Sequence, residues 1–213
     1  MDRLIALVER ELLPGLRIES VRPHDPIEVR SLPEPWLLVG KGNYAAVVSH
    51  PEAPGQVVKI YAPGRNGAAE EREVYRKLGR HPAYSECYGA GDRYLILKRM
   101  EGVTVFDCLH RGLPVPEQAI RDIDEALDYA RSRGLFPSDI HPKNMMVNEG
   151  RGLVIDVSDF LRPKNCFMWD DFKKAYYRCY APLLAERPLP LPLFVLNGVR
   201  KGYRLWKSGF RNR

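Results

Sequence analysis

Asp139, Asn144 and Asp156 are the residues of this 213-residue chain whose types and spacing point most directly to chemistry. Asp139 and Asn144 lie five positions apart in the segment Asp-Ile-His-Pro-Lys-Asn, and Asp156 follows the apolar run 153–155. Two carboxylates and a carboxamide offer hard oxygen atoms of the kind that Mg²⁺ binds, while water and substrate phosphates complete its coordination. The three residues therefore predict a magnesium site that handles a nucleotide.

A predicted β-hairpin would bring two of these residues together. Two short apolar runs flank a cluster of turn-forming residues at 148–152, which is typical of a hairpin. We expect Val147 to pair with Leu153. The same register places Asn144 opposite Asp156, with α-carbons about 4.5–5.5 Å apart.

A glycine-containing segment upstream could cover the phosphates of such a nucleotide. Gly40 and Gly42 lie between the strand-like runs 36–39 and 45–48. Because a strand follows the glycines, and not a helix, the segment is not a dinucleotide-binding fingerprint and is expected to form a hairpin. Its backbone amides can approach phosphates because the glycines carry no side chain.

Lys59 is the one charged residue in the apolar run 57–61. An unpaired ammonium is costly to bury, so Lys59 needs an anionic partner. Residues 68–78 show the apolar periodicity of a helix, and Glu71 on this helix offers a carboxylate. We therefore expect a pair between a strand lysine and a helix glutamate.

These parts, taken in chain order, resemble the protein-kinase-like superfamily over residues 37–160. The resemblance looks closest to small bacterial serine/threonine-kinase-like proteins, and more distant to minimal atypical kinases and aminoglycoside-type small-molecule kinases. It implies an α+β, bilobal protein-kinase-like fold. Residues 1–100 would form an antiparallel-sheet small lobe with an N-terminal helix, and residues 101–213 a truncated, mainly helical large lobe with a basic, aromatic tail.

The resemblance also implies roles in transferring a phosphoryl group from ATP. Lys59 would contact the α- and β-phosphates and pair with Glu71. Asp139 would orient the acceptor hydroxyl and take up its proton, while Asn144 and Asp156 would bind Mg²⁺.

Further positions are implied to bind the nucleotide. Gly40, Gly42 and Val47 belong to the glycine hairpin, and Leu97 would lie behind the adenine. The backbone of residues 98–100, including Lys98 and Met100, would run along the adenine edge.

The same predicted helix contains two other glutamates that could pair with Lys59, namely Glu70 and Glu73. Glu71 is preferred because its spacing to the apolar residues that follow resembles the helix of the family.

Several departures from the family pattern concern regulation and the acceptor. Pro137 and Ser138 replace the usual His-Arg before the catalytic aspartate, so we expect no switching by activation-loop phosphorylation. Ser158 stands where a glycine is usual. His141 replaces a lysine typical of protein serine/threonine kinases and is similar to small-molecule kinases, and no Ala-Pro-Glu-like segment follows position 158.

Three functions are consistent with these residues. The preferred one is an ATP- and Mg²⁺-dependent serine/threonine protein kinase whose substrate is a protein, including itself. The alternatives are a small-molecule kinase, and a nucleotide-binding pseudokinase or slow ATPase that acts as a switch.

Charge and composition indicate the role of the C-terminal tail and the location of the protein. Seven basic residues follow Glu186 without any acidic one, and removing them from the net charge of +6 leaves −1 for the rest. This tail, with its interleaved aromatics, could contact an acidic partner, RNA or anionic lipid. Our preferred interpretation is a closing helix that packs its aromatics on the large lobe. Four scattered cysteines and the lack of a long apolar run favour a cytoplasmic protein without a transmembrane segment.

Overall fold

The computed structural model describes residues 2–22, 25–65 and 67–210, and its contacts divide the chain into two compact units. Unit 1 consists of Met1–Glu101, Leu127–Ser138 and Ile155–Lys164. Unit 2 consists of Gly102–Ala126, Asp139–Val154 and Asn165–Arg213. The first break lies one residue from the predicted lobe boundary, but two later segments group with unit 1. The assignment of residues 1–100 and 101–213 to two lobes stays a prediction.

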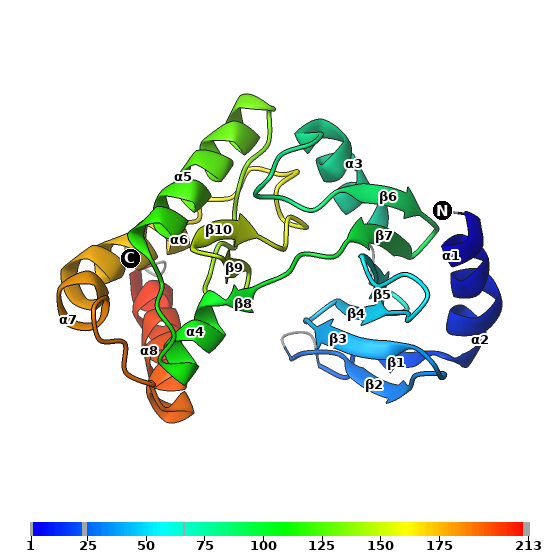
Figure 1. Cartoon of the computed structure of the whole chain (residues 1–213), viewed down its shortest axis with the longest axis horizontal. Coiled ribbons are helices and arrows are strands. Elements are labelled where there is room, and N and C mark those ends of the chain that lie inside the picture. Colours follow the sequence, from blue (N-terminus) through cyan, green and yellow to red (C-terminus); the bar gives the residue numbers. More distant parts are fainter. Residues whose placement is uncertain (1, 23–24, 66, 211–213) are drawn as a thin grey trace. The chain divides into compact units, whose positions relative to one another are not determined.

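Unit 1 is built on a five-stranded antiparallel sheet (Figure 1). In spatial order its strands are β3 (Leu37–Lys41), β4 (Ala45–Ser49), β5 (Gln56–Tyr61), β7 (Tyr94–Lys98) and β6 (Cys87–Ala90). The predicted glycine hairpin is confirmed, because β3 and β4 are adjacent and the Gly42 N–H donates to the Ala45 carbonyl at 2.9 Å. A separate two-stranded sheet contains β1 (Arg17–Glu19) and β2 (Glu28–Ser31).

The two faces of this sheet have different surroundings. Side chains alternate along each strand, so neighbouring residues point to opposite faces. On β5, Val58 and Ile60 belong to a buried apolar core that also contains residues of the N-terminal helical segment. That segment comprises α1 (Asp2–Leu7), a π-helical stretch (Val8–Leu12) and α2 (Leu13–Gly15). Lys59 and Tyr61 therefore point to the opposite face.

Helix α3 (Ala68–Leu78) has the bounds that the periodicity predicts. Its last carbonyl groups, which no turn of the helix can satisfy, accept hydrogen bonds from the unit 1 segment Leu127–Ser138, which contains the end of α5 (Glu117–Ser132). The Tyr129 hydroxyl donates to the Leu78 carbonyl at 2.5 Å, and Arg133 Nε donates to the Lys77 carbonyl at 2.8 Å. The C-terminal end of α3 is thereby anchored within its own unit.

Unit 2 contains the predicted second hairpin, in a register that differs from the expected one. The three-stranded sheet has the order β10 (Arg151–Val154), β9 (Met145–Asn148) and β8 (Val103–Thr104). Val147 pairs with Gly152, and the ladder ends where Met145 pairs with Val154. The predicted pairing of Val147 with Leu153, and of Asn144 with Asp156, is therefore wrong by one residue.

Two local features explain the register. Glu149 and Gly150 both have positive φ, 49° and 80°, as in a two-residue type I′ turn, whereas the predicted register needs three residues in the turn. Gly152 also lies against helix α5, where an added Cβ would be 2.1 Å from the Ala119 carbonyl oxygen. A one-residue shift would place a side chain at this contact.

The remaining part of unit 2 is helical, as predicted for a mainly helical second lobe. Its helices are α4 (Val105–Arg111), the first part of α5 (Glu117–Ser132), α6 (Met168–Ala175), a π-helical stretch (Tyr176–Tyr180), α7 (Ala181–Leu184) and α8 (Leu193–Phe210). None of the helices in the described part of the chain combines the length and apolar character that a membrane crossing requires.

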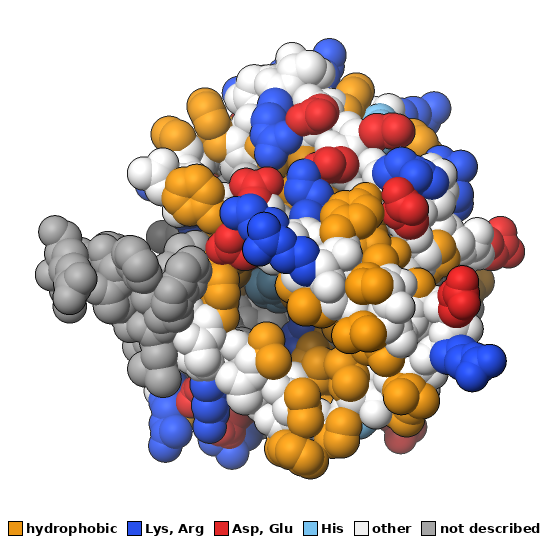
Figure 2. Space-filling view, turned by 90° about the vertical axis from the view of Figure 1, so that its left-hand side faces the viewer, with side chains coloured by type: hydrophobic (Ala, Val, Ile, Leu, Met, Phe, Trp, Pro, Cys, Tyr) orange, Lys and Arg blue, Asp and Glu red, His pale blue; other side chains and the backbone are white. Residues whose placement is uncertain are grey.

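The aromatic residues of the tail lie in different surroundings. The Tyr203 hydroxyl donates to the Asp171 carboxylate of α6 at 2.9 Å, whereas Phe194 at the start of α8 is exposed. Figure 2 shows hydrophobic side chains gathered on one face of the molecule, and exposed apolar residues of unit 2 include Leu183, Leu189 and Val199. The side chains of Trp206 and Phe210 lie outside the described residues.

Candidate functional site

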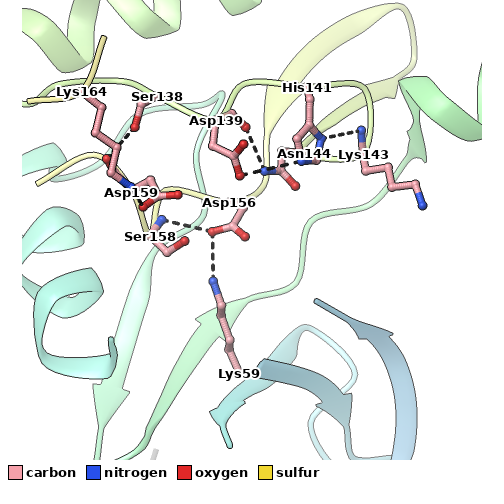
Figure 3. Close-up of polar contacts among 10 residues, drawn as sticks. All are labelled: Lys59, Ser138, Asp139, His141, Lys143, Asn144, Asp156, Ser158, Asp159 and Lys164. Carbon is pink, nitrogen blue, oxygen red and sulfur yellow. Dashed lines mark hydrogen bonds and ion pairs between the residues drawn. The ribbon is translucent and has the colours of Figure 1, made fainter. Parts of the chain in front are cut away.

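Lys59, Glu71 and Asp156 form an ion-pair cluster within unit 1. Lys59 Nζ lies 2.9 Å from Glu71 Oε1 and 3.0 Å from Asp156 Oδ1. Figure 3 shows the lysine side chain extended toward the Asp156 carboxylate. The side chain of Glu71 is 0% exposed and that of Lys59 11%, whereas Asp156 is 35% exposed. The structure thus brings the expected strand lysine to the helix glutamate and to the predicted metal-binding aspartate.

The charges of this cluster stabilise one another. Burial alone would lower the pKa of Lys59, but the carboxylates of Asp156 and Glu71 raise it well above its ordinary value. Burial opposes ionisation of Asp156, yet the Lys59 ammonium and the Ser158 N–H lower its pKa on balance. For Glu71, burial outweighs the attraction of Lys59, so its pKa is raised. Lys59 and Asp156 are therefore both charged at neutral pH.

The two competing glutamates of α3 have other partners. Glu70 pairs with Arg162, and Glu73 pairs with Arg76 on the same helix at 2.6 Å. Glu71 is the one of the three that faces the sheet.

Two of the predicted nucleotide-binding residues, Val47 and Leu97, lie on the same sheet face as Lys59. Val47 pairs with Lys59 across β4 and β5, so their side chains share a face. Leu97 pairs with Val57, two residues before Lys59, and lies on this face as well. A Cβ added at Gly40 or Gly42 would meet nothing within 4 Å, so the space beside both glycines is open.

The segment predicted to run along the adenine edge, residues 98–100, begins with the last residue of β7. Lys98 is exposed and Met100 half-buried. The Lys98 N–H donates to the Glu86 carbonyl at 2.8 Å, and the Arg99 N–H donates to the Gly55 carbonyl at 2.9 Å. These two amides are therefore engaged within unit 1.

Asp139 and Asn144 are brought together within unit 2 by a tight loop (Figure 3). Asn144 Nδ2 donates to the Asp139 carbonyl oxygen at 3.0 Å, and the Asn144 N–H donates to the His141 carbonyl at 2.8 Å. His141 Nδ1 accepts from the Lys143 N–H at 3.2 Å, which supports a structural role for this ring. Asp139 itself has a φ of 58°, a left-handed conformation that non-glycine residues adopt mainly at special sites.

Tyr61 is a site residue that the sequence reasoning did not single out. Its hydroxyl donates to Glu71 Oε2, and the residue is buried. The signal was available, since strand alternation places position 61 on the same face as position 59. The Ser158 N–H, another contact not anticipated, donates to Asp156 Oδ1 at 3.1 Å.

The sheet lysine paired with a helix glutamate and an aspartate in unit 1, and the Asp-x-x-x-x-Asn loop in unit 2, are each features of the protein-kinase-like class. No family model matches the chain. It is 34% identical over 166 residues to "Putative serine/threonine-protein kinase YrzF" of Bacillus subtilis (strain 168), covering 76% of this chain and 77% of that protein. The chain therefore belongs to the protein-kinase-like superfamily and has its α+β fold.

The chain is also similar to parts of other kinases. The chain is 32% identical over 90 residues to CBL-interacting protein kinase 10 of Oryza sativa subsp. japonica, covering 39% of this chain but 20% of that protein. A mutant PknI kinase domain of Mycobacterium tuberculosis has a TM-score of 0.43 at 22% identity, with 62% of each chain covered. Rad53 in complex with AMP-PNP has a TM-score of 0.49 at 19% identity, with 74% of this chain and 42% of the other covered.

Proposed function

We propose that this protein is an ATP- and Mg²⁺-dependent phosphotransferase, and specifically a minimal serine/threonine protein kinase. The observation that carries the proposal is the bonding of the Lys59 ammonium to both Glu71 and Asp156. A buried cation with this pair of partners is held in one place and keeps its charge, as the binding of nucleotide phosphates requires.

The nucleotide would be held mainly by unit 1. The Lys59 ammonium binds the α- and β-phosphates, and the open space beside Gly40 and Gly42 allows backbone to approach them. Leu97 offers an apolar surface to the adenine. We assign the amide of Met100 to the adenine edge, since those of Lys98 and Arg99 are engaged.

The donor set fits Mg²⁺. Asp156 is ionised, and Asn144 uses its amide nitrogen for Asp139, which orients its amide oxygen as an acceptor. These are the hard oxygen donors that the ion prefers, so Asp156 and Asn144 would hold it. When bound, Mg²⁺ neutralises charge on the transferring phosphate.

Asp139 takes up the proton of the acceptor hydroxyl. Its side chain is half-exposed, so an incoming substrate can reach the carboxylate. A serine or threonine hydroxyl of a protein, including the chain itself, is the acceptor that the name of the bacterial relative favours. A small-molecule acceptor is the second candidate, favoured by His141 in place of the lysine usual in protein kinases.

Transfer from ATP tests the proposal. The full chain is incubated with γ-labelled ATP, Mg²⁺ and a cell extract, beside Asp139→Ala and Asp156→Ala. We expect labelled protein, reduced at least about 100-fold by either substitution. Asp128→Ala is the matched control, because Asp128 is an exposed aspartate of α5. Label in a soluble metabolite would support the small-molecule kinase, and Mg-ATP binding without transfer would support the pseudokinase or switch.

The cellular setting forms part of the proposal. The four cysteines are all free, which suits the reducing, ATP-rich cytoplasm. The basic tail remains a candidate contact for an acidic partner, RNA or anionic lipid.

A further inference from the structure

Tyr61, the last residue of β5, connects the sheet to the carboxylate that pairs with Lys59. Its hydroxyl donates to Glu71 Oε2, and Lys59 Nζ lies 2.8 Å from the same oxygen. Tyr61 is 3% exposed and Glu71 is fully buried, so water does not compete for these bonds. One carboxylate is thus held by two donors that lie two positions apart on one strand.

The ring of Tyr61 also contacts the start of α3. A Cβ added at Gly67, the residue before the helix, would lie 2.4 Å from Tyr61 Cε1. Ala45 and Ala68 form a buried apolar cluster with the same ring. Small residues at these three positions leave room for a tyrosine. The ring therefore fixes the first turn of α3, while the hydroxyl binds a carboxylate one turn further on.

The protonation states suit a permanent donor. Burial raises the pKa of Tyr61 far above neutral pH, so the hydroxyl keeps its proton. Burial also raises the pKa of Glu71, and the hydrogen bond from Tyr61 is among the contacts that lower it. The tyrosine hydroxyl accordingly favours the ionised form of Glu71, which is the form that binds an ammonium.

We propose that Tyr61 is a positioning residue for phosphate binding, which holds the Glu71 carboxylate in place and, through it, the Lys59 ammonium. This inference rests on the proposed function. Tyr61, Glu71 and Lys59 are bonded to one another within one unit. The Tyr61 hydroxyl acts through Glu71, and the centre of the Tyr61 ring lies 5.7 Å from Lys59 Nζ, a contact that a phenylalanine ring keeps.

The test compares Tyr61→Phe with a closely matched variant. Tyr94 is 2% exposed, lies on the opposite face of the same sheet and donates to the Glu9 carboxylate at 2.7 Å. Tyr94→Phe therefore removes the tyrosine–carboxylate hydrogen bond of a comparably buried ring away from the site, although its acceptor Glu9 is exposed. Mg-ATP affinity of the full chain is measured from pH 5 to 8 for both variants, and folding is checked by thermal unfolding.

We expect Tyr61→Phe to weaken Mg-ATP binding roughly three- to tenfold at neutral pH, the effect of one lost hydrogen bond. The pH at which binding is half lost should rise, because Glu71 keeps its proton to higher pH. Tyr94→Phe should change neither quantity. In a Glu71→Gln background, Tyr61→Phe should add less than about twofold, because residues that act through one group are not additive.

The outcomes separate this inference from the proposed function. If the folded wild-type chain fails to bind Mg-ATP, the proposed function falls and the inference falls with it. If the wild type binds and Tyr61→Phe binds equally well at every pH, the function stands and the inference is overturned. A loss of thermal stability alone, or an equal loss in the Glu71→Gln background, would also overturn it.

Discussion

Lys59 and Asp156 lie 97 positions apart in the chain, and their charged groups are 3.0 Å apart. Glu71 binds the same ammonium and is fully buried. Removing Lys59 would leave two carboxylates without their cation, and a buried charge that loses its partner is strongly destabilising. The stability of unit 1 is therefore tied to the residue that is expected to bind phosphate.

Lys59→Met should lower the free energy of unfolding by about 3–5 kcal/mol near neutral pH. The pKa of Glu71 is already raised by burial, and without Lys59 it rises further. Glu71 then holds a proton in the folded state that it loses on unfolding, so stability falls as pH rises above the ordinary glutamate pKa. Urea unfolding at pH 5 and pH 8 measures the slope.

The double variant Lys59→Met with Glu71→Gln is the control. A neutral amide needs no cation, so this variant should recover much of the lost stability and show a flatter pH dependence. A single variant as stable as the wild type at both pH values would contradict the prediction.

Asp122 anchors the β9–β10 hairpin to α5. It is 5% exposed and accepts from the Gly152 N–H at 2.9 Å and from Arg151 Nε at 2.7 Å. Asp122→Asn should cost about 1.5–3 kcal/mol at neutral pH, the worth of hydrogen bonds to a charged group. Asp128→Asn is the matched control, 76% exposed on the same helix, with an expected cost below about 0.5 kcal/mol.

The contribution of Asp122 should also depend on pH. Burial opposes ionisation of Asp122, but its hydrogen bonds and Arg151 lower its pKa on balance. Because the folded pKa is depressed, the stabilisation is present above the unfolded pKa of about 3.9 and is lost as pH falls through the folded value. The stability gap between wild type and Asp122→Asn, measured by urea unfolding, should therefore shrink below about pH 4. A gap that stays constant down to pH 3 would show that the charge is not responsible.

The parts of the site that local pattern fixes could be predicted from the sequence. Apolar periodicity gave the bounds of the helix at residues 68–78, and the chemistry of a buried cation required a partner for Lys59. The glycine hairpin followed from two strand-like runs around Gly40 and Gly42. Each of these features depends on residues close in sequence or on one buried charge that needs a partner.

The features that were missed depend on contacts between distant segments. The register of β9 and β10 is tied to the approach of Gly152 to Ala119, which no local pattern reveals. The role of Tyr61 requires the first turn of α3 to lie against its ring. The turn type and the position of the helix depend on tertiary contacts. Sequence spacing alone therefore predicted the hairpin correctly but its register wrongly.

Gly152→Ala tests the contact that accompanies this register. An added Cβ would lie 2.1 Å from the Ala119 carbonyl oxygen and 2.9 Å from its carbon, both backbone atoms that cannot rotate away. We expect a loss of about 3 kcal/mol in the free energy of unfolding. In Gly55→Ala a Cβ meets nothing within 4 Å, so a change within about 0.5 kcal/mol is expected. Equal stability of the two variants would mean that strand and helix are not in close contact.

Substitution of Asp139 should reduce catalysis while leaving the folded state stable. Its φ of 58° is a conformation that Asn tolerates nearly as well as Asp, so Asp139→Asn should keep the free energy of unfolding within about 1 kcal/mol. Asn cannot take up the proton of an acceptor hydroxyl, so phosphoryl transfer should fall at least about 100-fold. Mg-ATP affinity should change less than about threefold, because the phosphates are assigned to Lys59 and Mg²⁺ to Asp156 and Asn144. Phosphoryl transfer and Mg-ATP binding are measured on the same preparation of Asp139→Asn. A variant that transfers phosphate at the wild-type rate would exclude Asp139 as the proton acceptor.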